Sequence, residues 1–576
     1  MRSRCCTLVT KRTSVVLAVL IATVSSPGSV MSADPDWVAR GAYGMVATDS
    51  QLASQIGKQI LVDGGNAVDA AVAVSFALAV TRPYSTGLGG GGFMIAHLGD
   101  KKVVVQDFRE TAPAASTRDM FAGKTPPGGL SPSQIGGLAV AVPGLVAGRT
   151  QALSKWGTMP LEKVVAPAVR LAREGFPVDA DYVRVTNHLT KKFTAHRELQ
   201  TTAGYIWKTF LNEGKPFHVG DTLKQPALAN LIEKIGSEGA DFFYRGPVAR
   251  AIAKTLTNHG GIMTEKDLAA YKPRQRRPIK TSFVGYDFLL MPPPSSGGIA
   301  LAQMLSMLSM FPAYRDVDEG RTIHYRIEAM KHAFADRARY LGDSDFAKIP
   351  VRELLSGRYL ITKVSQTRPD RTGPQEQYGT HGLVSDSGTS HFCVADEQGK
   401  VVVSTETINT EFGSLVAVDE WGLVLNNEMD DFTARPGKPN AFGLIQSQAN
   451  AIAPGKRPLS SMSPTIVLKH DKPILLLGAS GGPRIITAVL NVVLGVLSDG
   501  LSLPDAIERI RPHHQWEPNE VFFDKTPPES LVSALKKRGH KISDIRKGAA
   551  VQAIQWDATQ WVGVSDPRKG GKPSGY

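Results

Sequence analysis

The chain has 576 residues, of which 42% are apolar and 21% charged, and it carries a formal net charge of +13. The apolar fraction excludes a disordered chain, the 56 glycines and 37 prolines follow no collagen period, and three cysteines are too few for a disulfide scaffold. The length predicts a large globular protein with an ample core, with about three domains at roughly 100–200 residues each, or one large multilayer domain.

The first segment, 1–33, has the order of a secretory signal peptide. A basic start precedes an apolar run over 14–24, and small residues follow. Such a run is shorter than the roughly 20 residues that cross a bilayer, although an uncleaved membrane anchor stays open as the alternative. We therefore expect a mature protein that is periplasmic or secreted, without a further membrane span. The basic residues of the segment are Arg2, Arg4, Lys11 and Arg12.

Removal of this segment changes the charge and the cysteine count of the protein. Four basic residues leave with it, so the net charge falls from +13 to +9, and loss of Cys5 and Cys6 leaves Cys393 as the single thiol. The remaining positive charge weakly indicates an anionic substrate or surface. The sequence has no basic run with interleaved aromatic residues, so no nucleic-acid partner is expected.

Two helices and two strands are predicted at the start of the mature chain. The helices span 51–62 and 67–80, and the second is apolar on nearly every face, which is typical of a helix buried on all sides. A glycine-rich loop over 85–92 leads into strands at 93–98 and 103–108. Phosphate-binding loops instead run from a strand through glycines into a helix. The reversed order favours a tight backbone crossing beside a site over nucleotide binding.

The middle of the chain is predicted to be mainly helical. Helices dominate 145–280, and another follows three prolines at 299–310. The segment 365–388 is polar and contains Pro, Gly, Gln and Asp, which is typical of an exposed linker. A mainly helical part over 34–364 is therefore expected before this linker.

Strand pairs mark the chain after the linker, because short runs of alternating apolar residues are separated there by turn residues. Helical runs before the linker and hairpins after it predict helices layered on stacked antiparallel sheets, an α+β fold. The predicted strand pairs are 390–395 with 401–407, 464–468 with 474–477, and 550–556 with 561–564. The predicted helices of this part are 483–497, 504–510 and 529–538.

Ser480 is one candidate nucleophile. It is the serine of a G-x-S-x-G sequence at 478–482, with a predicted strand before it and a helix after it, which is the context of a serine-hydrolase nucleophile elbow. The residues after it form hairpins and not the βα units that such a hydrolase needs. We therefore favour the other use of the same geometry, in which the amides of Gly481 and Gly482 stabilise an oxyanion. The acids and histidines that could complete a serine triad are Asp499, Asp505, His513, His514 and His540.

Thr389 is the second candidate nucleophile. It follows Gly388 at the end of the linker and begins the first predicted strand of the hairpin-rich part. A threonine hydroxyl needs a base beside it, and an N-terminal threonine carries one in its own α-amine, whose pKa is about 8. The hydroxyl could release that amine itself by attacking the Gly388 carbonyl. On spacing alone, a threonine after a linker is more often the ordinary start of a strand than a nucleophile.

Several separate motifs, in order along almost the whole mature chain, resemble those of the γ-glutamyltranspeptidase family of N-terminal nucleophile hydrolases. The resemblance implies a four-layer αββα sandwich, one domain formed by two autoproteolytic subunits over 34–388 and 389–576, with cleavage between Gly388 and Thr389. It implies no metal or organic cofactor. The motifs are Asp107–Glu110, Pro292–Gly298, Thr389–Cys393, Thr405–Asn409, Phe412–Gly413, Asn426–Asp431, Arg457–Pro464 and Gly481–Gly482.

The resemblance also implies a role for each matching residue in cleaving glutathione or a related γ-glutamyl compound. Thr389 would attack the γ-carbonyl group, Thr407 would orient its hydroxyl, and the Gly481 and Gly482 amides would form the oxyanion hole. The resulting ester would pass its glutamyl group to water or to an amino-acid or peptide acceptor. Arg109, Ser460 and Ser461 would hold the α-carboxylate of the substrate, and Asn409, Glu428 and Asp431 its α-ammonium group.

Three other functions stay open at this stage. Cephalosporin acylases are similar but take a glutaryl group, which has no α-amine, so that Glu428 and Asp431 would be left unpaired. A Ser480 esterase and an exported binding protein without activity are the others.

Phe442, in a lid loop at about 436–447, stands where some bacterial members of the family have Tyr, so that a hydrogen bond of the lid is expected to be missing.

Overall fold

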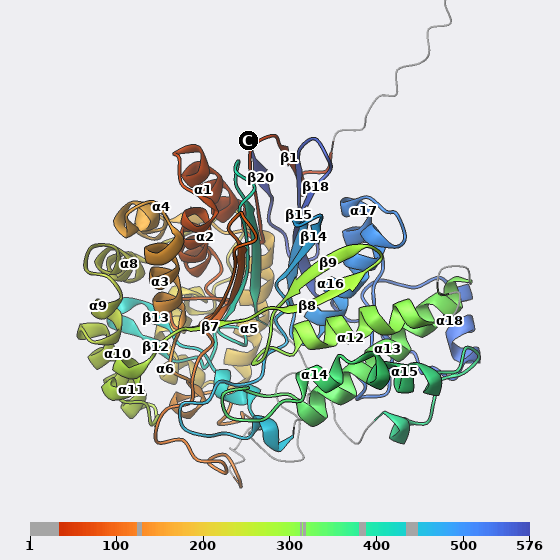
Figure 1. The fold of residues 1–576 in the computed structure, drawn as a ribbon. Coiled ribbons are helices and arrows are strands. Elements are labelled where there is room, and N and C mark those ends of the chain that lie inside the picture. The colour runs from red at the N-terminus through yellow and green to blue at the C-terminus, as the bar shows by residue number, and fades with distance from the viewer. Residues whose placement is uncertain (1–33, 124–129, 312–313, 315–317, 379–387, 434–446) are drawn as a thin grey trace, which may run out of the picture. The chain divides into compact units, whose positions relative to one another are not determined.

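The computed structural model describes residues 34–123, 130–311, 314, 318–378, 388–433 and 447–576. The predicted signal segment 1–33 and the predicted lid residue Phe442 lie outside the described residues. Those from Asp36 onward form one compact unit. Two seven-stranded antiparallel sheets stack face to face at its centre, and helices cover the outer face of each sheet (Figure 1). The four-layer αββα sandwich that the family resemblance implied is thus confirmed.

The first sheet contains mostly strands from the end of the chain. Neighbouring strands pair antiparallel throughout, including the predicted pairs β14 with β15 and β18 with β19. In spatial order its strands are β1 (Val38–Gly41), β19 (Trp561–Ser565), β18 (Ala550–Trp556), β15 (Lys472–Ser480), β14 (Thr465–Lys469), β9 (Tyr286–Leu290) and β8 (Ile279–Phe283).

The second sheet places the strand after Thr389 at its middle. The predicted pair β10 with β11 is confirmed, and both strands are flanked by strands from the first hundred residues of the chain. In spatial order the strands are β20 (Ser574–Gly575), β2 (Met45–Thr48), β10 (Ser390–Ala395), β11 (Val401–Thr407), β3 (Gly91–His97), β4 (Val103–Asp107) and β7 (Arg274–Arg276).

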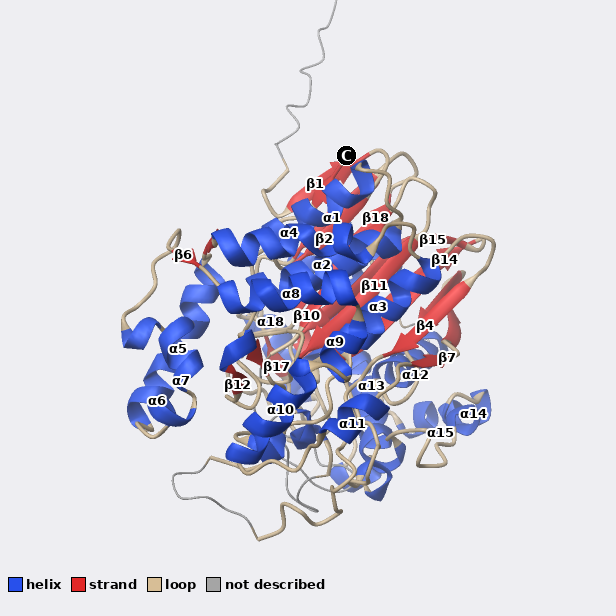
Figure 2. Cartoon of the chain, turned by 90° about the vertical axis from the view of Figure 1, so that its left-hand side faces the viewer, coloured by secondary structure: helices blue, strands red, loops and turns tan. Residues whose placement is uncertain are grey.

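Helices from the first half of the chain cover the outer face of the second sheet, and several of them lie in front of its strands in Figure 2. α2 is central, and all its residues are buried, as its uniformly apolar sequence predicted. An Asn66 cap with Asp69 in a capping box fixes where it begins. The helices of this part are α1 (Gln51–Val62), α2 (Ala67–Thr81), α3 (Leu145–Trp156), α4 (Leu161–Glu174), α5 (Ala180–Ala195), α6 (Leu199–Thr202), α7 (Gly204–Thr209), α8 (Pro226–Glu238), α9 (Ala240–Tyr244), α10 (Pro247–Asn258) and α11 (Glu265–Ala270).

The helices beside the first sheet come from two separate stretches of the chain, one before and one after Thr389. The predicted helices at 299–310, 483–497, 504–510 and 529–538 are confirmed, with boundaries shifted by two residues at most. No helix among the described residues is both long and apolar enough to cross a membrane. The helices are α12 (Gly297–Met310), α13 (Glu319–Tyr340), α14 (Val351–Leu354), α15 (Gly357–Gln366), α16 (Arg484–Leu497), α17 (Leu503–Glu508) and α18 (Glu529–Lys537).

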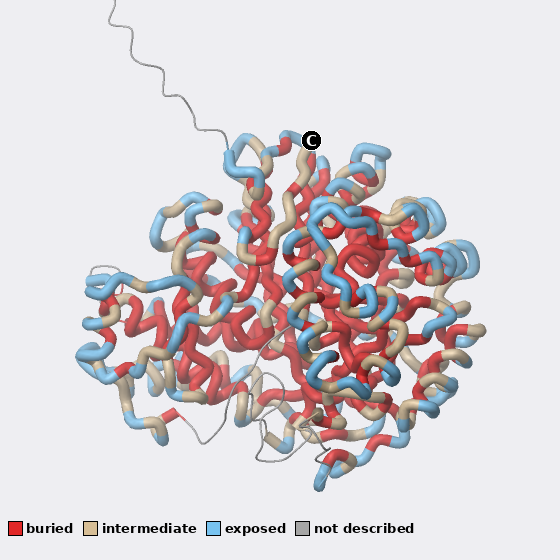
Figure 3. The backbone as a smooth tube through the Cα atoms, turned by 180° about the vertical axis from the view of Figure 1, so that it is seen from behind, coloured by how far each residue is buried: buried red, intermediate tan, exposed pale blue. Residues whose placement is uncertain are grey.

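Three hydrophobic clusters fill the three interfaces between the four layers. The buried residues, red in Figure 3, therefore gather at the centre of the molecule. Side chains alternate along β10, so Phe392 and Val394 face the outer helices whereas Cys393 and Ala395 face the other sheet. Burial raises the pKa of the Cys393 thiol well above its usual range. The single thiol of the predicted mature protein is therefore a core residue.

The predicted linker differs along its length. Residues 368–371 are exposed, but the chain then turns inward, and Tyr378 is buried. Its hydroxyl donates to Glu328 on α13, and Thr372 donates to the same carboxylate at 2.7 Å. Buried polar contacts therefore hold Thr372 and Tyr378 of this segment against α13. Its polar composition alone does not predict these contacts.

Candidate active site

Thr389 lies directly before β10, and its side chain is nearly buried, with 6% of the residue exposed. Its hydroxyl is 2.6 Å from the carbonyl oxygen of Gly388 and 3.5 Å from the hydroxyl of Thr407. Thr407, at the end of the neighbouring strand β11, donates to the same carbonyl oxygen at 2.8 Å. Strand pairing thus brings both threonine hydroxyls to the peptide bond that was predicted to be cut.

Two cavities share Thr389 in their walls, and together these walls contain every described residue that was predicted for the γ-glutamyl site. The smaller one, about 20 Å³, has room for about one water molecule. Its wall includes Arg109, Thr389, Thr407, Asn409, Glu428, Asp431, Ser460, Ser461 and Gly482.

The larger cavity, about 240 Å³, opens on the other side of the candidate nucleophile and carries charges of both signs. It contains Gly388, Thr389 and Gly481, and also Ser480. Cationic and anionic side chains face the same space there, which suits a ligand that itself has both charges. The charged residues of its wall are Asp181, Arg184, Glu411, Lys547 and Lys569, with His188 beside them.

Arg109 is buried among carboxylates. Its guanidinium lies 2.8 Å from Glu428 and 2.5 Å from Asp431, and Glu110 is 3.8 Å away. Burial disfavours the charged guanidinium, but the three carboxylates outweigh this effect and raise its pKa above the usual range. The residue expected to hold a carboxylate and the residues expected to hold an ammonium group therefore pair with one another in this structure.

The carboxylates of this cluster have raised pKa values because burial outweighs the attraction of Arg109 and, for Asp431, also that of Arg337. The pKa of Glu428 lies well above its usual range, that of Asp431 is raised, and that of Glu110 is raised to about 8. The three acids outnumber the arginine at their centre, so the cluster can take a further positive charge. An α-ammonium group of a substrate would supply it.

Thr407 and Asn409 follow one another closely at the end of β11. The amide of Asn409 donates to the Thr407 hydroxyl at 2.7 Å, which leaves that hydroxyl's proton for Gly388. Asn409 itself has a positive φ of 77°, a conformation that Asn tolerates better than most residues. Its side-chain amide donates to the carbonyl oxygen of Asn427 at 3.0 Å, which ties the strand end to the acidic turn at 428–431.

Gly481 and Gly482 join β15 to α16 with positive φ angles of 135° and 57°. A Cβ atom at Gly481 would lie 2.8 Å from the Cα of Ala549, so no larger residue fits there. Gly481 contributes to the wall of the larger cavity and Gly482 to that of the smaller one, and both cavities contain Thr389. A backbone turn at a helix start beside the nucleophile suits an oxyanion site.

Ser480 does not form the serine triad that was kept open. Its hydroxyl lies 3.5 Å from the ammonium group of Lys569. The downstream acids and histidines are engaged elsewhere: Asp499 with Arg326 and Arg509, Asp505 with Ser502, His513 with Thr487 and Gln515, His514 with the amide of Trp516, and His540 with His324.

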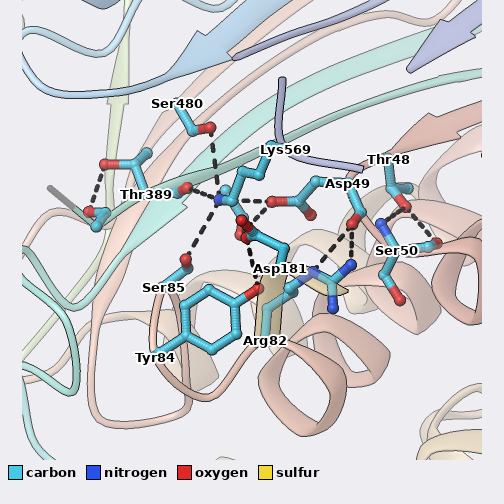
Figure 4. Close-up of polar contacts among 12 residues, drawn as sticks. Thr48, Asp49, Ser50, Arg82, Tyr84, Ser85, Asp181, Thr389, Ser480 and Lys569 are labelled. Carbon is cyan, nitrogen blue, oxygen red and sulfur yellow. Dashed lines mark hydrogen bonds and ion pairs between the residues drawn. The ribbon is translucent and has the colours of Figure 1, made fainter. Parts of the chain in front are cut away.

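Lys569 is a residue of the site that the sequence did not single out. Figure 4 shows its ammonium group between four partners. It lies 2.5 Å from the carbonyl oxygen of Thr389, 2.7 Å from Asp49 and 3.2 Å from Ser85. It therefore fixes the backbone of the candidate nucleophile to the start of α1 and to the glycine-rich loop. No local pattern around position 569 indicates this, because its partners lie far away in the sequence.

One group of side chains in the described part of the chain could hold a metal ion: the ligand atoms of His324, Glu328 and His540 all lie within 4.8 Å of one another. The side chains of these three residues already form hydrogen bonds to one another or to neighbouring groups. The two imidazoles contact each other at 2.7 Å, and His324 also contacts the carbonyl oxygen of Arg368 at 2.7 Å. Glu328 accepts from the hydroxyls of Thr372 and Tyr378. The cluster fits a structural hydrogen-bond network.

Comparisons with known proteins agree with this geometry. A family model described as gamma-glutamyltranspeptidase matches residues 53–576. The "Glutathione hydrolase proenzyme" of Escherichia coli (strain K12) is 42% identical over 534 residues, covering 92% of this chain and 91% of that protein. The protein of the same name from Pseudomonas sp. (strain A14) is 39% identical over 538 residues, covering 92% and 91%.

Among solved structures, a cephalosporin acylase from Bacillus halodurans superimposes with a TM-score of 0.81 at 28% identity, covering 96% of this chain and 99% of that one. The two sequence relatives are more similar in sequence than this structural relative. The fold is therefore shared between two activities, and the site must distinguish them.

Proposed function

The chain belongs to the γ-glutamyltranspeptidase family, and from that premise we propose that Thr389 is its nucleophile, released by self-cleavage of the Gly388–Thr389 bond. The protein is a γ-glutamyl hydrolase and transpeptidase that acts on glutathione and related compounds. One observation carries the proposal: Thr389 lies where a small cavity with Arg109 and acids in its wall meets a larger cavity of mixed charge.

Self-cleavage begins with the Thr389 hydroxyl, which lies beside the Gly388 carbonyl group. The oxygen attacks the carbonyl carbon, the C–N bond breaks, and an ester forms while the α-amine of Thr389 is released. Water then hydrolyses the ester, which leaves a carboxylate on Gly388 and restores the hydroxyl. Thr407 supports this step because its hydroxyl donates to the carbonyl oxygen, where negative charge develops.

Turnover uses the same hydroxyl on a different carbonyl group. The free α-amine takes the hydroxyl proton, and the Thr389 oxygen attacks the γ-carbonyl carbon of the substrate. The Gly481 and Gly482 amides stabilise the oxyanion, a contribution that is typically about 3–4 kcal/mol per donor. The leaving amine takes a proton, and the γ-glutamyl ester then passes to water or to an acceptor amine.

Recognition of the glutamyl group rests on its two charges. The acids around Arg109 lack positive charge, so we assign the α-ammonium group to Glu428 and Asp431, with Asn409 close by. Arg109, Ser460 and Ser461 would receive the α-carboxylate. Entry of the substrate then replaces part of the internal pairing of Arg109 with Glu428 and Asp431.

The acceptor and the location of the protein are finer proposals. An amino acid or peptide acceptor carries both charges, and the larger cavity offers both signs in its wall. We therefore place the leaving group and the acceptor there. The first 33 residues would direct export to the periplasm or the medium, which fractionation of cells would test: a protein that stays in the cytoplasm would contradict it.

The test of the proposed function compares the protein with Thr389→Ala and Ser480→Ala variants. The protein is expected to give two fragments on a denaturing gel, with Thr389 as the first residue of the smaller one, and to release p-nitroaniline from γ-glutamyl-p-nitroanilide, faster when a dipeptide is added. Thr389→Ala is expected to stay whole and to lose turnover, and Ser480→Ala to keep both. An uncut chain that turns over, or turnover that depends on Ser480, would overturn the proposal.

A glutaryl anilide in the same assay addresses the acylase activity of the structural relative. Glutaryl lacks the α-ammonium group, so it brings no cation to the carboxylates that Arg109 contacts. We expect the γ-glutamyl anilide to be preferred by at least about 100-fold in kcat/KM, because each hydrogen bond between a carboxylate and the α-ammonium group is worth about 1.5–3 kcal/mol and glutaryl forms none of them. A preference for glutaryl would assign the chain to the acylase activity instead.

A further inference from the structure

Arg337 is a second arginine in the wall of the smaller cavity, and neither the motifs nor the family resemblance pointed to it. It lies on α13, is 2% exposed, and faces the same space as Arg109, Ser460 and Ser461. Its sequence position, near the end of a long helix, carries no sign of a ligand role. The fold alone brings it to the site.

The two arginines of this cavity differ in their partners. Arg109 has three carboxylates within 3.8 Å. Arg337 donates only to hydroxyls, at 3.0 Å to Ser296 and 3.4 Å to Ser461. Among the described residues it forms no salt bridge, and its Nη1 has no hydrogen-bond partner.

The pKa values follow from this difference. Burial lowers the pKa of Arg337 to about 10, and the charge of Asp431 opposes this only in part. The pKa of Arg109 is raised instead, because its carboxylates outweigh burial. Arg337 is therefore a buried cation whose charge the protein itself does not balance.

A buried cation without a paired anion is costly, and an anionic ligand that reaches it recovers that cost. The neighbouring Ser461 hydroxyl offers a further donor, and a guanidinium binds a carboxylate with two parallel hydrogen bonds. In contrast, the guanidinium of Arg109 already contacts two carboxylates of the cavity. The cation with donor capacity to spare is thus Arg337.

We propose that Arg337 binds the α-carboxylate of the γ-glutamyl substrate together with Ser461, as a second arginine of this subsite beside Arg109. The inference rests on the proposed function, because it assigns one charge of that function's substrate. It adds Arg337 to the residues that receive the carboxylate, whereas Glu428 and Asp431 suit the ammonium group.

The experiment uses two substrates that differ in one group. γ-Glutamyl-p-nitroanilide has the α-carboxylate, and 4-aminobutanoyl-p-nitroanilide keeps the amine but lacks the carboxylate. Arg337→Gln is expected to lower kcat/KM for the first substrate by about 10- to 100-fold, mostly through KM, because a hydrogen bond to a charged group is lost. With the second substrate it is expected to change kcat/KM by less than about 3-fold, since no carboxylate is present to bind.

Two further variants separate this role from an effect on the fold. Arg339→Gln removes a positive charge from an exposed position of the same helix and is expected to leave both substrates unaffected. Arg337→Lys keeps the positive charge but not the paired N–H donors of the guanidinium. It is expected to show a smaller fall in kcat/KM than Arg337→Gln, and only with the first substrate. If Arg337→Gln is not cut into two fragments, the kcat/KM values of Arg337→Lys with the two substrates are compared instead.

An equal loss on both substrates would overturn the inference, because it would give Arg337 a purely structural role. If the second substrate turns over too slowly, competitive inhibition by L-glutamate and by 4-aminobutanoate provides the same comparison, and equal weakening of both again overturns it. Absence of turnover of γ-glutamyl-p-nitroanilide by the unaltered protein would instead contradict the proposed function itself. The two failures are thus distinguishable.

Discussion

At the scale of single residues, the carbonyl oxygen of Gly388 receives two threonine hydroxyls, one from the next residue and one from Thr407, eighteen positions later. The first hydroxyl belongs to the group that would attack, and the second stabilises charge on the oxygen that is attacked. The same pair would serve again after cleavage, when a substrate carbonyl replaces that of Gly388. One hydrogen-bond arrangement thus suits both maturation and turnover.

Glu110 gives a pH-dependent prediction at this scale. Burial raises its pKa to about 8, although Arg109 lies 3.8 Å away. The folded protein therefore keeps a proton that the unfolded chain releases near pH 4.5, and stability falls as pH rises from about 4.5 to about 8, by up to about 1.4 kcal/mol per pH unit. Glu110→Gln stays neutral, so its melting temperature is expected to rise relative to the parent over this window and to level off above it.

The measurement is thermal unfolding between pH 5 and pH 9. The parent protein and its Glu110→Gln variant both carry Thr389→Ala, so that neither is expected to cut itself. Glu174→Gln, at an exposed position at the end of α4, is the matched control and is expected to show a difference that does not change with pH. A constant difference for Glu110→Gln as well would show that this carboxyl is not protonated in the fold.

At the scale of elements, the junction of β15 with α16 sets the position of the two glycine amides. The strand lies in the middle of the first sheet, between β18 and β14, and the helix is buried along most of its length. Two rigid elements therefore hold the short turn between them. A site that must place donors at an oxyanion benefits from such a support, because the donors need no reordering during the reaction.

Gly481→Ala tests this junction. A methyl group there would meet the backbone of Ala549 at 2.8 Å, and the φ of 135° is unfavourable for any side chain. We expect kcat to fall by at least about 100-fold, the typical effect of losing one oxyanion donor. The control is Gly500→Ala, which has a φ of 71° but open space around it.

Gly500→Ala is expected to cost about 1 kcal/mol of stability, from backbone strain alone, and to keep kcat. Steady-state kinetics of the processed protein and its melting temperature separate the two effects. If Gly481→Ala keeps the kcat of the unaltered protein, the junction does not position a catalytic amide.

At the scale of the whole molecule, the two parts divided at Thr389 are interleaved in both sheets. In the second sheet, β10 and β11 lie between β2 and β3, and in the first sheet the strands after Thr389 lie between β1 and β9. Cleavage of the proposed Gly388–Thr389 bond would leave all these hydrogen-bonded pairs in place. The two fragments would therefore share two sheets and three hydrophobic clusters.

We expect the cut protein to behave as one particle until it is denatured. Size-exclusion chromatography of the processed protein is expected to give the same elution volume as the uncut Thr389→Ala chain, whereas a denaturing gel separates two fragments. Separation of the fragments without denaturant would contradict the interleaved arrangement. The physical reason is that neither fragment can bury its strand edges or its apolar faces alone.

Much of the local structure could be predicted from the sequence. The helix at 51–62, the strands at 390–395 and 401–407, and the turn between these strands lie where periodicity and turn residues placed them. Such patterns depend on neighbours a few residues away, and the buried α2 is equally visible in composition. The short strands β1, β2 and β20 carry too few residues for a pattern, and pairing with distant strands defines them.

The sequence by itself determined the layers, the family and the candidate site residues that lie in motifs, because motifs and periodicity are written in consecutive residues. The tertiary structure decided how the charges of the site are shared. Arg109 pairs with acids more than three hundred residues later, and Lys569 reaches Asp49 across most of the chain. Arg337 reaches the cavity with hydroxyls as its hydrogen-bond acceptors and, among the described residues, without a salt bridge. Such contacts depend on which strands and helices pack together, and no local pattern encodes the distance between two side chains that only the completed core brings together.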